Sequence, residues 1–98
     1  MDALLRCQVS PGMFSGEVAV RSRAADGTEF SLFVSDDFGE CDRAIPADGS
    51  VDGWLCVEVL ASEGPLVLVR LPDQTFENGQ TLTVRDTEVE LRSRRETV

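Results

Sequence analysis

The chain has 98 residues and contains no histidine, no lysine and no tyrosine. A Ser-His or Cys-His nucleophilic pair, a Schiff-base lysine, a P-loop lysine and a tyrosine general acid are therefore all excluded. These absences remove most familiar active sites. We accordingly expect a protein that is not an enzyme, with no catalytic residue, no cofactor and no metal ligand.

Long apolar runs are absent as well. The longest, such as residues 66–69, fall far short of the roughly 20 residues that a membrane-spanning helix needs. The N-terminal residues 1–6 carry an acid where a signal peptide has basic residues, and they lack a sustained apolar segment. We expect a cytoplasmic protein that does not enter a membrane.

Cysteine is scarce and irregularly spaced. The three cysteines, Cys7, Cys41 and Cys56, are odd in number and far apart, unlike the disulfide framework of a small secreted domain, so we expect reduced thiols. Cys7 and Cys56 lie in apolar strand patterns and are predicted to be small buried hydrophobes. Cys41 lies among acids and is predicted to be accessible, with a thiolate disfavoured by neighbouring carboxylates.

Acidic residues dominate the charge. There are 18 Asp and Glu against nine basic residues, all of them arginine, which gives a net charge of −9. Hydrophobic residues make up 42% of the chain, and at this length they supply one core rather than two. We expect one domain over residues 1–91. Residues 92–98 have little apolar character and are expected to fray.

Alternation of apolar and polar residues predicts strands throughout. The clearest units are a hairpin over 18–34, which turns at 24–27, and a hairpin over 54–71, which turns at 61–65. Shorter strands are predicted around 5–9, around 81–84 after the Asn78-Gly79 turn, and around 89–91. No window has helical periodicity, and at most one short turn is expected within 36–43.

Six or seven short strands indicate an all-β fold. We predict a small SH3-like barrel of about five to seven antiparallel strands, with a small β-sandwich as the alternative. The two hairpins also match at an offset of 37 residues, which places Gly16 on Gly53 and Val20 on Val57. A duplication would produce this match, but we favour shared hairpin chemistry, because turns alone place the glycines.

The second hairpin is apolar on both faces. If the N-terminal strand covers its outer face, the pattern is ordinary barrel core, and this is the interpretation we favour. Otherwise Trp54, Leu66 and Leu68 form an exposed patch that binds a partner protein or a second copy of the chain. Glu58 and Arg70 interrupt this face and are predicted to pair across the strands.

A second candidate surface is the acidic segment 35–53, which has a charge of −5. Its acids are Asp36, Asp37, Glu40, Asp42, Asp48 and Asp52. The first four are our candidates for contact with a basic partner surface. The spacing does not match an EF-hand and offers no zinc motif, so a solvated loop is favoured over a divalent-cation site. Phe38 is expected to plug the space beneath this loop.

The sequence therefore favours a non-enzymatic protein-interaction module, regulatory in character. One alternative is a nucleic-acid- or ribosome-associated barrel, but residues 85–96 carry four arginines and four acids, so nucleic acid is a poor partner. The other alternative is a carboxylate- or metal-dependent enzyme that uses Asp36 with Asp37 or Glu58.

Overall fold

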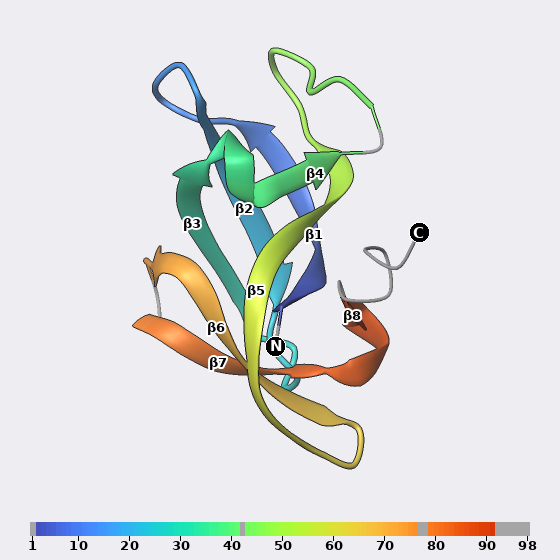
Figure 1. Cartoon of the computed structure of the whole chain (residues 1–98). Coiled ribbons are helices and arrows are strands. Elements are labelled where there is room, and N and C mark those ends of the chain that lie inside the picture. Colours follow the sequence, from blue (N-terminus) through green and yellow to red (C-terminus); the bar gives the residue numbers. More distant parts are fainter. Residues whose placement is uncertain (1, 42, 77–78, 92–98) are drawn as a thin grey trace.

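Figure 1 shows the computed structural model of the protein, which describes residues 2–41, 43–76 and 79–91. The described chain forms one curled antiparallel sheet, so the predicted all-β class is confirmed. In chain order the strands are β1 (Asp2–Pro11), β2 (Glu17–Arg23), β3 (Glu29–Ser35), β4 (Gly39–Cys41), β5 (Val51–Glu63), β6 (Leu66–Thr75), β7 (Gly79–Arg85) and β8 (Val89–Leu91). Short 3-10 turns, η1 (Asp36–Phe38) and η2 (Asp86–Glu88), join β3 to β4 and β7 to β8.

Strands β1 and β5 lie in the middle of the sheet. The main strand order is β3-β2-β1-β5-β6-β7, while β4 adds to β5 and β8 adds to β1. Every strand except β3 and β7 therefore pairs with one of these two central strands. In Figure 1 the long strand β5 runs down the middle of the view, and its hairpin with β6 extends below the rest of the sheet.

The second half of the chain repeats the strand pairing of the first. In order, β1, β2, β3, η1 and β4 correspond to β5, β6, β7, η2 and β8. The register agrees residue by residue: Leu5 pairs with Val89, and Leu55, fifty residues after Leu5, pairs with Gly39. Leu5 and Leu55 are also direct partners of each other, so an approximate two-fold relation passes between them.

Identical residues at corresponding positions lie mostly in the core. The offset is fifty residues, or forty-nine between β2 and β6. An offset of 37 residues places β2 on β5, and these strands are not equivalent in the sheet, which agrees with the favoured interpretation that shared hairpin chemistry produced that match. The identical pairs are Asp2/Asp52, Leu5/Leu55, Val9/Val59, Val18/Val67, Val20/Val69, Arg21/Arg70, Leu32/Leu82, Val34/Val84, Asp36/Asp86 and Glu40/Glu90.

Each 3-10 turn is fixed by an equivalent backbone hydrogen bond. The Asp36 N–H donates to the Gly16 carbonyl at 2.9 Å, and the Asp86 N–H donates to the Pro65 carbonyl at 2.8 Å. These bonds tie the end of β3 or β7 to the turn that precedes β2 or β6. The chain can then cross to the central pair as β4 or β8.

The two ends of the sheet meet through the turns of the outer hairpins. The Ala25 N–H, from the β2–β3 turn, donates to the Thr83 carbonyl of β7 at 2.9 Å. In return the Phe76 N–H, after β6, donates to the Ser31 carbonyl of β3 at 3.0 Å. Strand β3 also packs against β6. The sheet is therefore curled, and each half holds the edge of the other.

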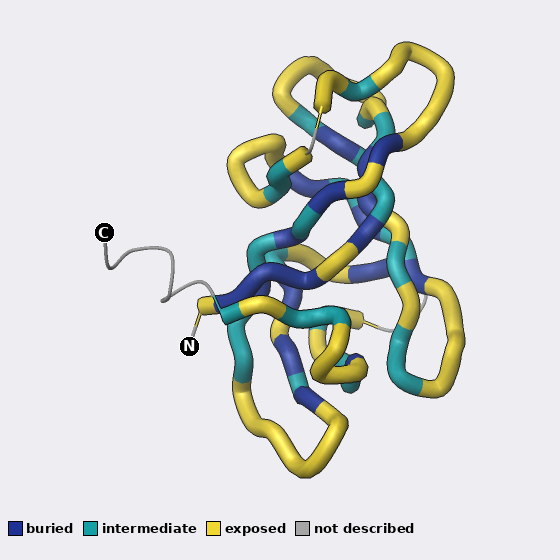
Figure 2. Tube along the Cα trace, turned by 90° about the vertical axis from the view of Figure 1, so that its right-hand side faces the viewer, coloured by how far each residue is buried: buried dark blue, intermediate teal, exposed yellow. Residues whose placement is uncertain are grey.

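One apolar cluster fills the concave side of the sheet, and both halves contribute to it. Figure 2 shows buried residues alternating with half-buried or exposed ones along the strands, while the hairpin ends are exposed. The largest fully buried side chains are Phe30, Leu4, Leu5, Leu32, Leu55, Leu71, Val9, Val20, Val69 and Val84. Leu4 lies in the opposite phase from the cluster and is covered on the outer side of β1.

Both predicted hairpins are confirmed, and their turns have the expected chemistry. Gly27 has a φ of 90°, and the Asp26 carboxylate accepts a hydrogen bond from the Thr28 N–H at 2.9 Å. Gly64 has a φ of 58° in the β5–β6 turn. Such positive φ values favour glycine over residues with a side chain. The predicted turn at Asn78-Gly79 falls partly outside the described residues.

The acidic segment differs from the predicted loop. The short turn predicted within 36–43 is the 3-10 turn η1, but β4 follows it and pairs with β5, which itself begins at Val51. Gly53 permits this pairing, since a Cβ there would clash with the Glu40 carbonyl oxygen. The segment is therefore partly a strand rather than one solvated loop.

The favoured explanation for the two-faced second hairpin was also wrong. Strand β1 pairs edge to edge with β5 and does not cover the outer face of the hairpin. On that face Leu60 and Leu66 are each 41% exposed, and Leu68 is half-buried. The second apolar phase is therefore surface rather than core.

Helical structure in the described ranges is limited to the two 3-10 turns. No described helix is long and apolar enough to cross a membrane. The predicted core cysteine, Cys7, is buried and the predicted accessible one, Cys41, is exposed, whereas Cys56 is half-buried rather than buried. The predicted tail, residues 92–98, lies outside the described residues.

We expect Leu5→Ala and Leu55→Ala each to lower the free energy of unfolding by about 2–5 kcal/mol, because each leaves a cavity at a fully buried site. The double variant should deviate from additivity, since the two side chains belong to partner residues. Equilibrium urea unfolding measures both effects. Leu66→Ala, at an exposed site, is the control, and equal losses in all three single variants would contradict the central role of this pair.

Candidate functional site

The three apolar residues predicted to form one patch do not come together. Trp54 lies opposite Arg6 near the start of β5. Leu68 lies opposite Ala61, seven residues further along that strand, which is roughly 20 Å at 3.3 Å per residue. Leu66 lies beyond it at the hairpin turn. Trp54 therefore belongs to a different part of the surface from the two leucines.

Trp54 is half-buried and already has a neighbour for its ring. The guanidinium carbon of Arg6 lies 5.6 Å from the ring centroid, within range of a cation–π interaction. On the other edge of β5, Trp54 is the register partner of Glu40, which is also half-buried. These contacts make Trp54 part of the outer surface of the central strands rather than an exposed anchor.

Glu58 and Arg70 pair across β5 and β6 as predicted. Arg70 donates from Nε to Glu58 Oε1 at 3.0 Å, and from Nη2 to the same oxygen. This hydrogen bonding, followed by the positive charge of Arg70, holds the pKa of Glu58 below its ordinary value of 4.5. The pair is partly exposed, so solvent screens it.

The residues nominated for carboxylate chemistry are only partly brought together. Asp37 and Glu58 line one hollow of about 340 Å³ beside Phe38, but Asp36 does not line it. A general acid needs a raised pKa, and the pKa of Glu58 is lowered. Phe38 is 43% exposed, so its predicted role as a buried plug was wrong.

The acids of segment 35–53 are spread over different elements. Asp36 and Asp37 are exposed on η1, where the Ser35 hydroxyl accepts a hydrogen bond from the Asp37 N–H at 3.4 Å. Glu40 lies on β4 beside Trp54, and Asp42 lies outside the described residues. Among the described residues, no three Cys, Asp or Glu side chains come close enough together to hold a metal ion.

The cysteines have distinct environments. Burial, and then the neighbouring Cys41 and Asp52, raises the pKa of the Cys7 thiol to about 12. Cys7 therefore stays protonated and unreactive at neutral pH. It fills the core as the counterpart of Val57 in the second half, which is consistent with a structural role.

A hollow of about 560 Å³ lies between the end of the β5–β6 hairpin and the η2–β8 segment. We call it the hairpin hollow. Of its apolar residues, Val67 is a buried member of the core, while Val59, Val89 and Leu91 are half-buried and pack against the core. Its complete lining is Val59, Ser62, Gly64, Val67, Asp86, Val89, Glu90 and Leu91.

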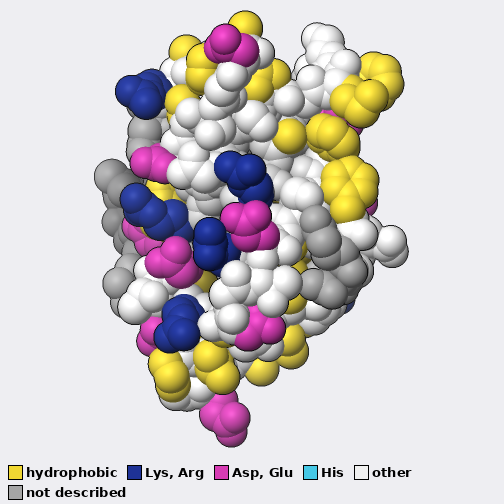
Figure 3. Space-filling view, turned by 180° about the vertical axis from the view of Figure 1, so that it is seen from behind, with side chains coloured by type: hydrophobic (Ala, Val, Ile, Leu, Met, Phe, Trp, Pro, Cys, Tyr) yellow, Lys and Arg dark blue, Asp and Glu magenta, His cyan; other side chains and the backbone are white. Residues whose placement is uncertain are grey.

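Exposed apolar side chains lie outside this hollow as well. Leu60 and Leu66 are on the hairpin that forms one wall of it, while Met13 and Phe14 are about three-quarters exposed in the β1–β2 loop and Phe76 is exposed after β6. Figure 3 shows hydrophobic side chains gathered at two ends of the rear face, with arginine and acidic side chains between them. The described surface thus carries separated apolar regions.

The sequence predicted both elements that line the hairpin hollow, but it did not predict that they lie next to each other. The hairpin and the strand at 89–91 were predicted, but their proximity depends on β8 crossing to β1. The detectable signal was the alternation of Val89 and Leu91 with Glu90, which resembles the pattern of a strand with one covered face.

Comparisons with known proteins give no relative. No family model matches the chain, and neither a curated protein nor a solved structure is significantly similar to it. The function must therefore be inferred from the surface of this chain alone.

We expect Arg70→Gln to raise the pKa of Glu58 towards 4.5, because the variant removes both the hydrogen bonds and the charge that lower it. The native pair stabilises the fold above the unfolded-state carboxyl pKa, and this contribution is lost as pH falls through the lowered folded pKa. The stability difference between wild type and variant should thus shrink in acid. Carboxyl carbon NMR titration and unfolding at several pH values measure this, and an unchanged Glu58 titration would refute the pairing.

Proposed function

We propose that the protein is a non-enzymatic protein-interaction module, regulatory in character, and that it binds through the hairpin hollow. The partner is a protein segment that presents an apolar side chain flanked by basic residues. The observation that supports this proposal is that one hollow has half-buried apolar side chains at its floor and the acidic side chains of Asp86 and Glu90 at its rim. This combination fits an apolar anchor with flanking positive charge.

The apolar floor is supported by comparison with the other half of the chain. Val59 is half-buried, whereas its counterpart Val9 is fully buried. In the first half, Ile45 from the segment after β4 packs against the core. The counterpart of that segment follows β8 and lies outside the described residues. Half-buried valine and leucine side chains around one hollow provide apolar area that a partner side chain can bury.

The charge of the rim supports a basic partner. Asp86 and Glu90 line the hollow, and Glu63 lies at the hairpin turn beside it. No described basic side chain lines the hollow. The net charge of −9 would also steer a positively charged partner towards the protein. Trp54 and the acids at 36, 37, 40 and 42 are not needed for this surface.

We further infer that each half, together with the central strand of the other half, adopts an SH3-like arrangement. The supporting observation is a path of five strands, β1-β5-β6-β7-β8, that returns through a 3-10 turn to its first strand. The equivalent path in the other half is β5-β1-β2-β3-β4. The two units would share the central pair. Fold resemblance of this kind supports an architecture and does not transfer a function.

A peptide titration tests the proposed function. We expect a capped peptide with one leucine between arginines to shift the amide signals of residues 59–67 and 86–91, and a peptide with glutamates in place of the arginines to leave them unchanged. Ser62→Trp should weaken binding about tenfold or more, because the indole fills the hollow. Ala61→Trp, on the opposite face of the hairpin, is the matched control.

Three results would reject the proposal: equal binding of both peptides, shifts confined to other strands, or unchanged affinity in the Ser62→Trp variant. Sedimentation of the protein alone gives a further check. Self-association that Ser62→Trp abolishes would identify a second copy of the chain as the occupant and would overturn the choice of a basic partner.

A further inference from the structure

Two hollows on the outer side of the sheet occupy equivalent places in the two halves. In the second half the hollow beside Phe38 is lined by Cys56, Glu58, Arg70 and Pro72. In the first half a hollow of about 290 Å³, which we call the arginine hollow, is lined by the corresponding residues Arg6, Gln8, Arg21 and Arg23. The repeat therefore produced the same concave place twice with different chemistry.

One residue is common to both hollows, but its partner differs. Arg70 donates hydrogen bonds to Glu58 across β5 and β6. Arg21 faces Gln8 in the same register across β1 and β2, so an amide replaces the carboxylate. Across β1 and β2, Arg21 therefore has no carboxylate at the position where its counterpart has one.

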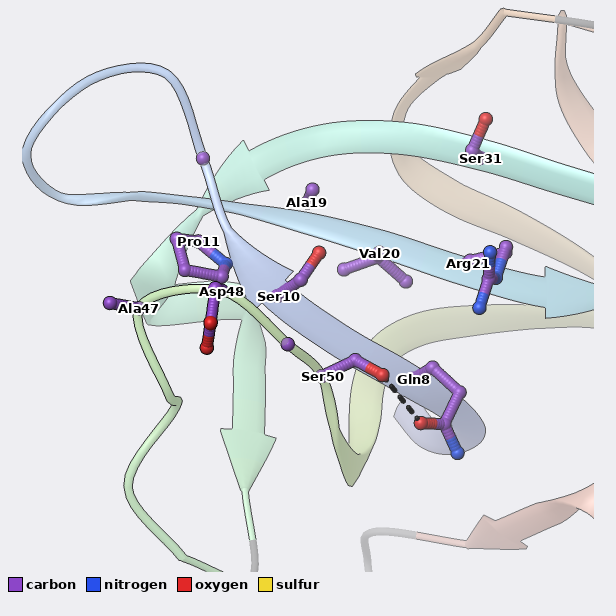
Figure 4. Close-up of a pocket in the computed structure, with 12 residues that line it drawn as sticks. Gln8, Ser10, Pro11, Ala19, Val20, Arg21, Ser31, Ala47, Asp48 and Ser50 are labelled. Carbon is purple, nitrogen blue, oxygen red and sulfur yellow. Dashed lines mark hydrogen bonds between the residues drawn. The ribbon is translucent and has the colours of Figure 1, made fainter.

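Gln8 is held by other groups. Its Nε2 donates to a carboxylate oxygen of Asp52. Its Oε1 accepts a hydrogen bond from the Ser50 hydroxyl at 3.1 Å, and Figure 4 draws this second bond. Among the described residues, no carboxylate oxygen lies within 4.0 Å of the Arg21 guanidinium. Arg21 thus presents a charge that the described part of the chain does not pair.

The remaining charged groups leave the hollow positive. Arg23 pairs with Glu29 at 3.3 Å. Arg6 lies over the Trp54 ring and has no ion pair within the described ranges. Glu88 is the other acid of the lining. The arginine hollow taken alone thus has three arginines against two glutamates, on a protein whose net charge is −9.

A second hollow, of about 700 Å³, adjoins the first and shares Arg21 and Gln8 with it. Ser10, Ser31 and Ser50 contribute hydroxyl groups to its lining, and Asp48 is its acid. Figure 4 shows Arg21 of β2 between Ser31 of β3 and Gln8 of β1. Ser31 is the register partner of Arg21 across β2 and β3, whereas the Ser50 hydroxyl donates to Gln8.

We propose that Arg21 is the principal contact of a binding site for an oxyanion, the phosphate or carboxylate group of a small molecule, in these two adjoining hollows. The planar fork of an arginine suits two oxygens of such a group. Most of its lining comes from β1, β2 and β3, with Glu88 of η2 and the segment 47–50 completing it, and no lining residue is shared with the hairpin hollow. It does not depend on the proposed function.

Titration of the full-length protein, labelled with nitrogen-15, with sodium phosphate, sodium acetate and sodium chloride at equal ionic strength tests the site. We expect saturable shifts at residues 8 and 21–23 with phosphate, acetate or both, and none with chloride. The oxyanion that binds more tightly identifies the ligand class. Equal shifts in chloride, or none in any salt, would overturn the proposal.

Matched variants test the role of Arg21. Arg21→Gln should weaken binding about tenfold or more, whereas Arg70→Gln, the same change at the equivalent position, should leave it unchanged. Gln8→Glu rebuilds the carboxylate–arginine pair of the second half and should also abolish binding. Arg21→Gln removes a cation, whereas Gln8→Glu adds an anion at an outer position. If one of these variants fails to fold, the other still tests the proposal.

The opposite substitution, made in the second half of the chain, gives an independent test. Glu58→Gln frees Arg70 and should create a second, weaker site beside Phe38 with new shifts near residue 70. Retained binding in Arg21→Gln or Gln8→Glu, equal loss in Arg70→Gln, or no new site in Glu58→Gln would contradict the assignment.

Discussion

The antiparallel pairing of β1 with β5 is the contact on which the rest of the sheet depends. Leu5 and Leu55 are partners at its centre and are completely buried. Each central strand also carries the hairpin of its own half and one short strand that crosses over from the end of the other half. Loss of this pairing would separate two sheets that each bury an incomplete apolar face, so the two halves are expected to be stable only together.

A shared scaffold with separate surfaces follows from the repeat. The identical residues are mainly those that fill the core, whereas the outer positions have diverged. With Gln8 at the position that corresponds to Glu58, Arg21 has no ion pair among the described residues, and the exposure of Val59 relative to Val9 opens one edge of the core. Core packing constrains volume and shape, while an outer residue needs only solvent compatibility, so functional differences collect on the outside.

The sequence predicted elements well where the signal was local. The hairpins over 18–34 and 54–71 follow from alternation and from glycine turns, and the Glu58–Arg70 pair follows from hairpin register. The sequence did not predict features whose place in the fold depends on contacts between residues that are far apart in the chain. Strand β4 has only three residues, and its pairing opposite Gly53 gives no periodic pattern. The repeat at fifty residues was missed because its identities are spread among strands, and the Trp54 patch failed because a long strand separates residues that share one face.

Native-state hydrogen exchange of the backbone amides tests the central claim most directly, because it measures the opening free energy of each strand separately. If the β1–β5 pair holds both halves together, the hydrogen-bonded amides of residues 3–9 and 51–57 will be the slowest to exchange, with one common free energy equal to that of global unfolding. The outer hairpins will open at lower free energy. Continued protection of β5 to β8 after β1 has exchanged would contradict this account, because it would mean that one half is stable without the other.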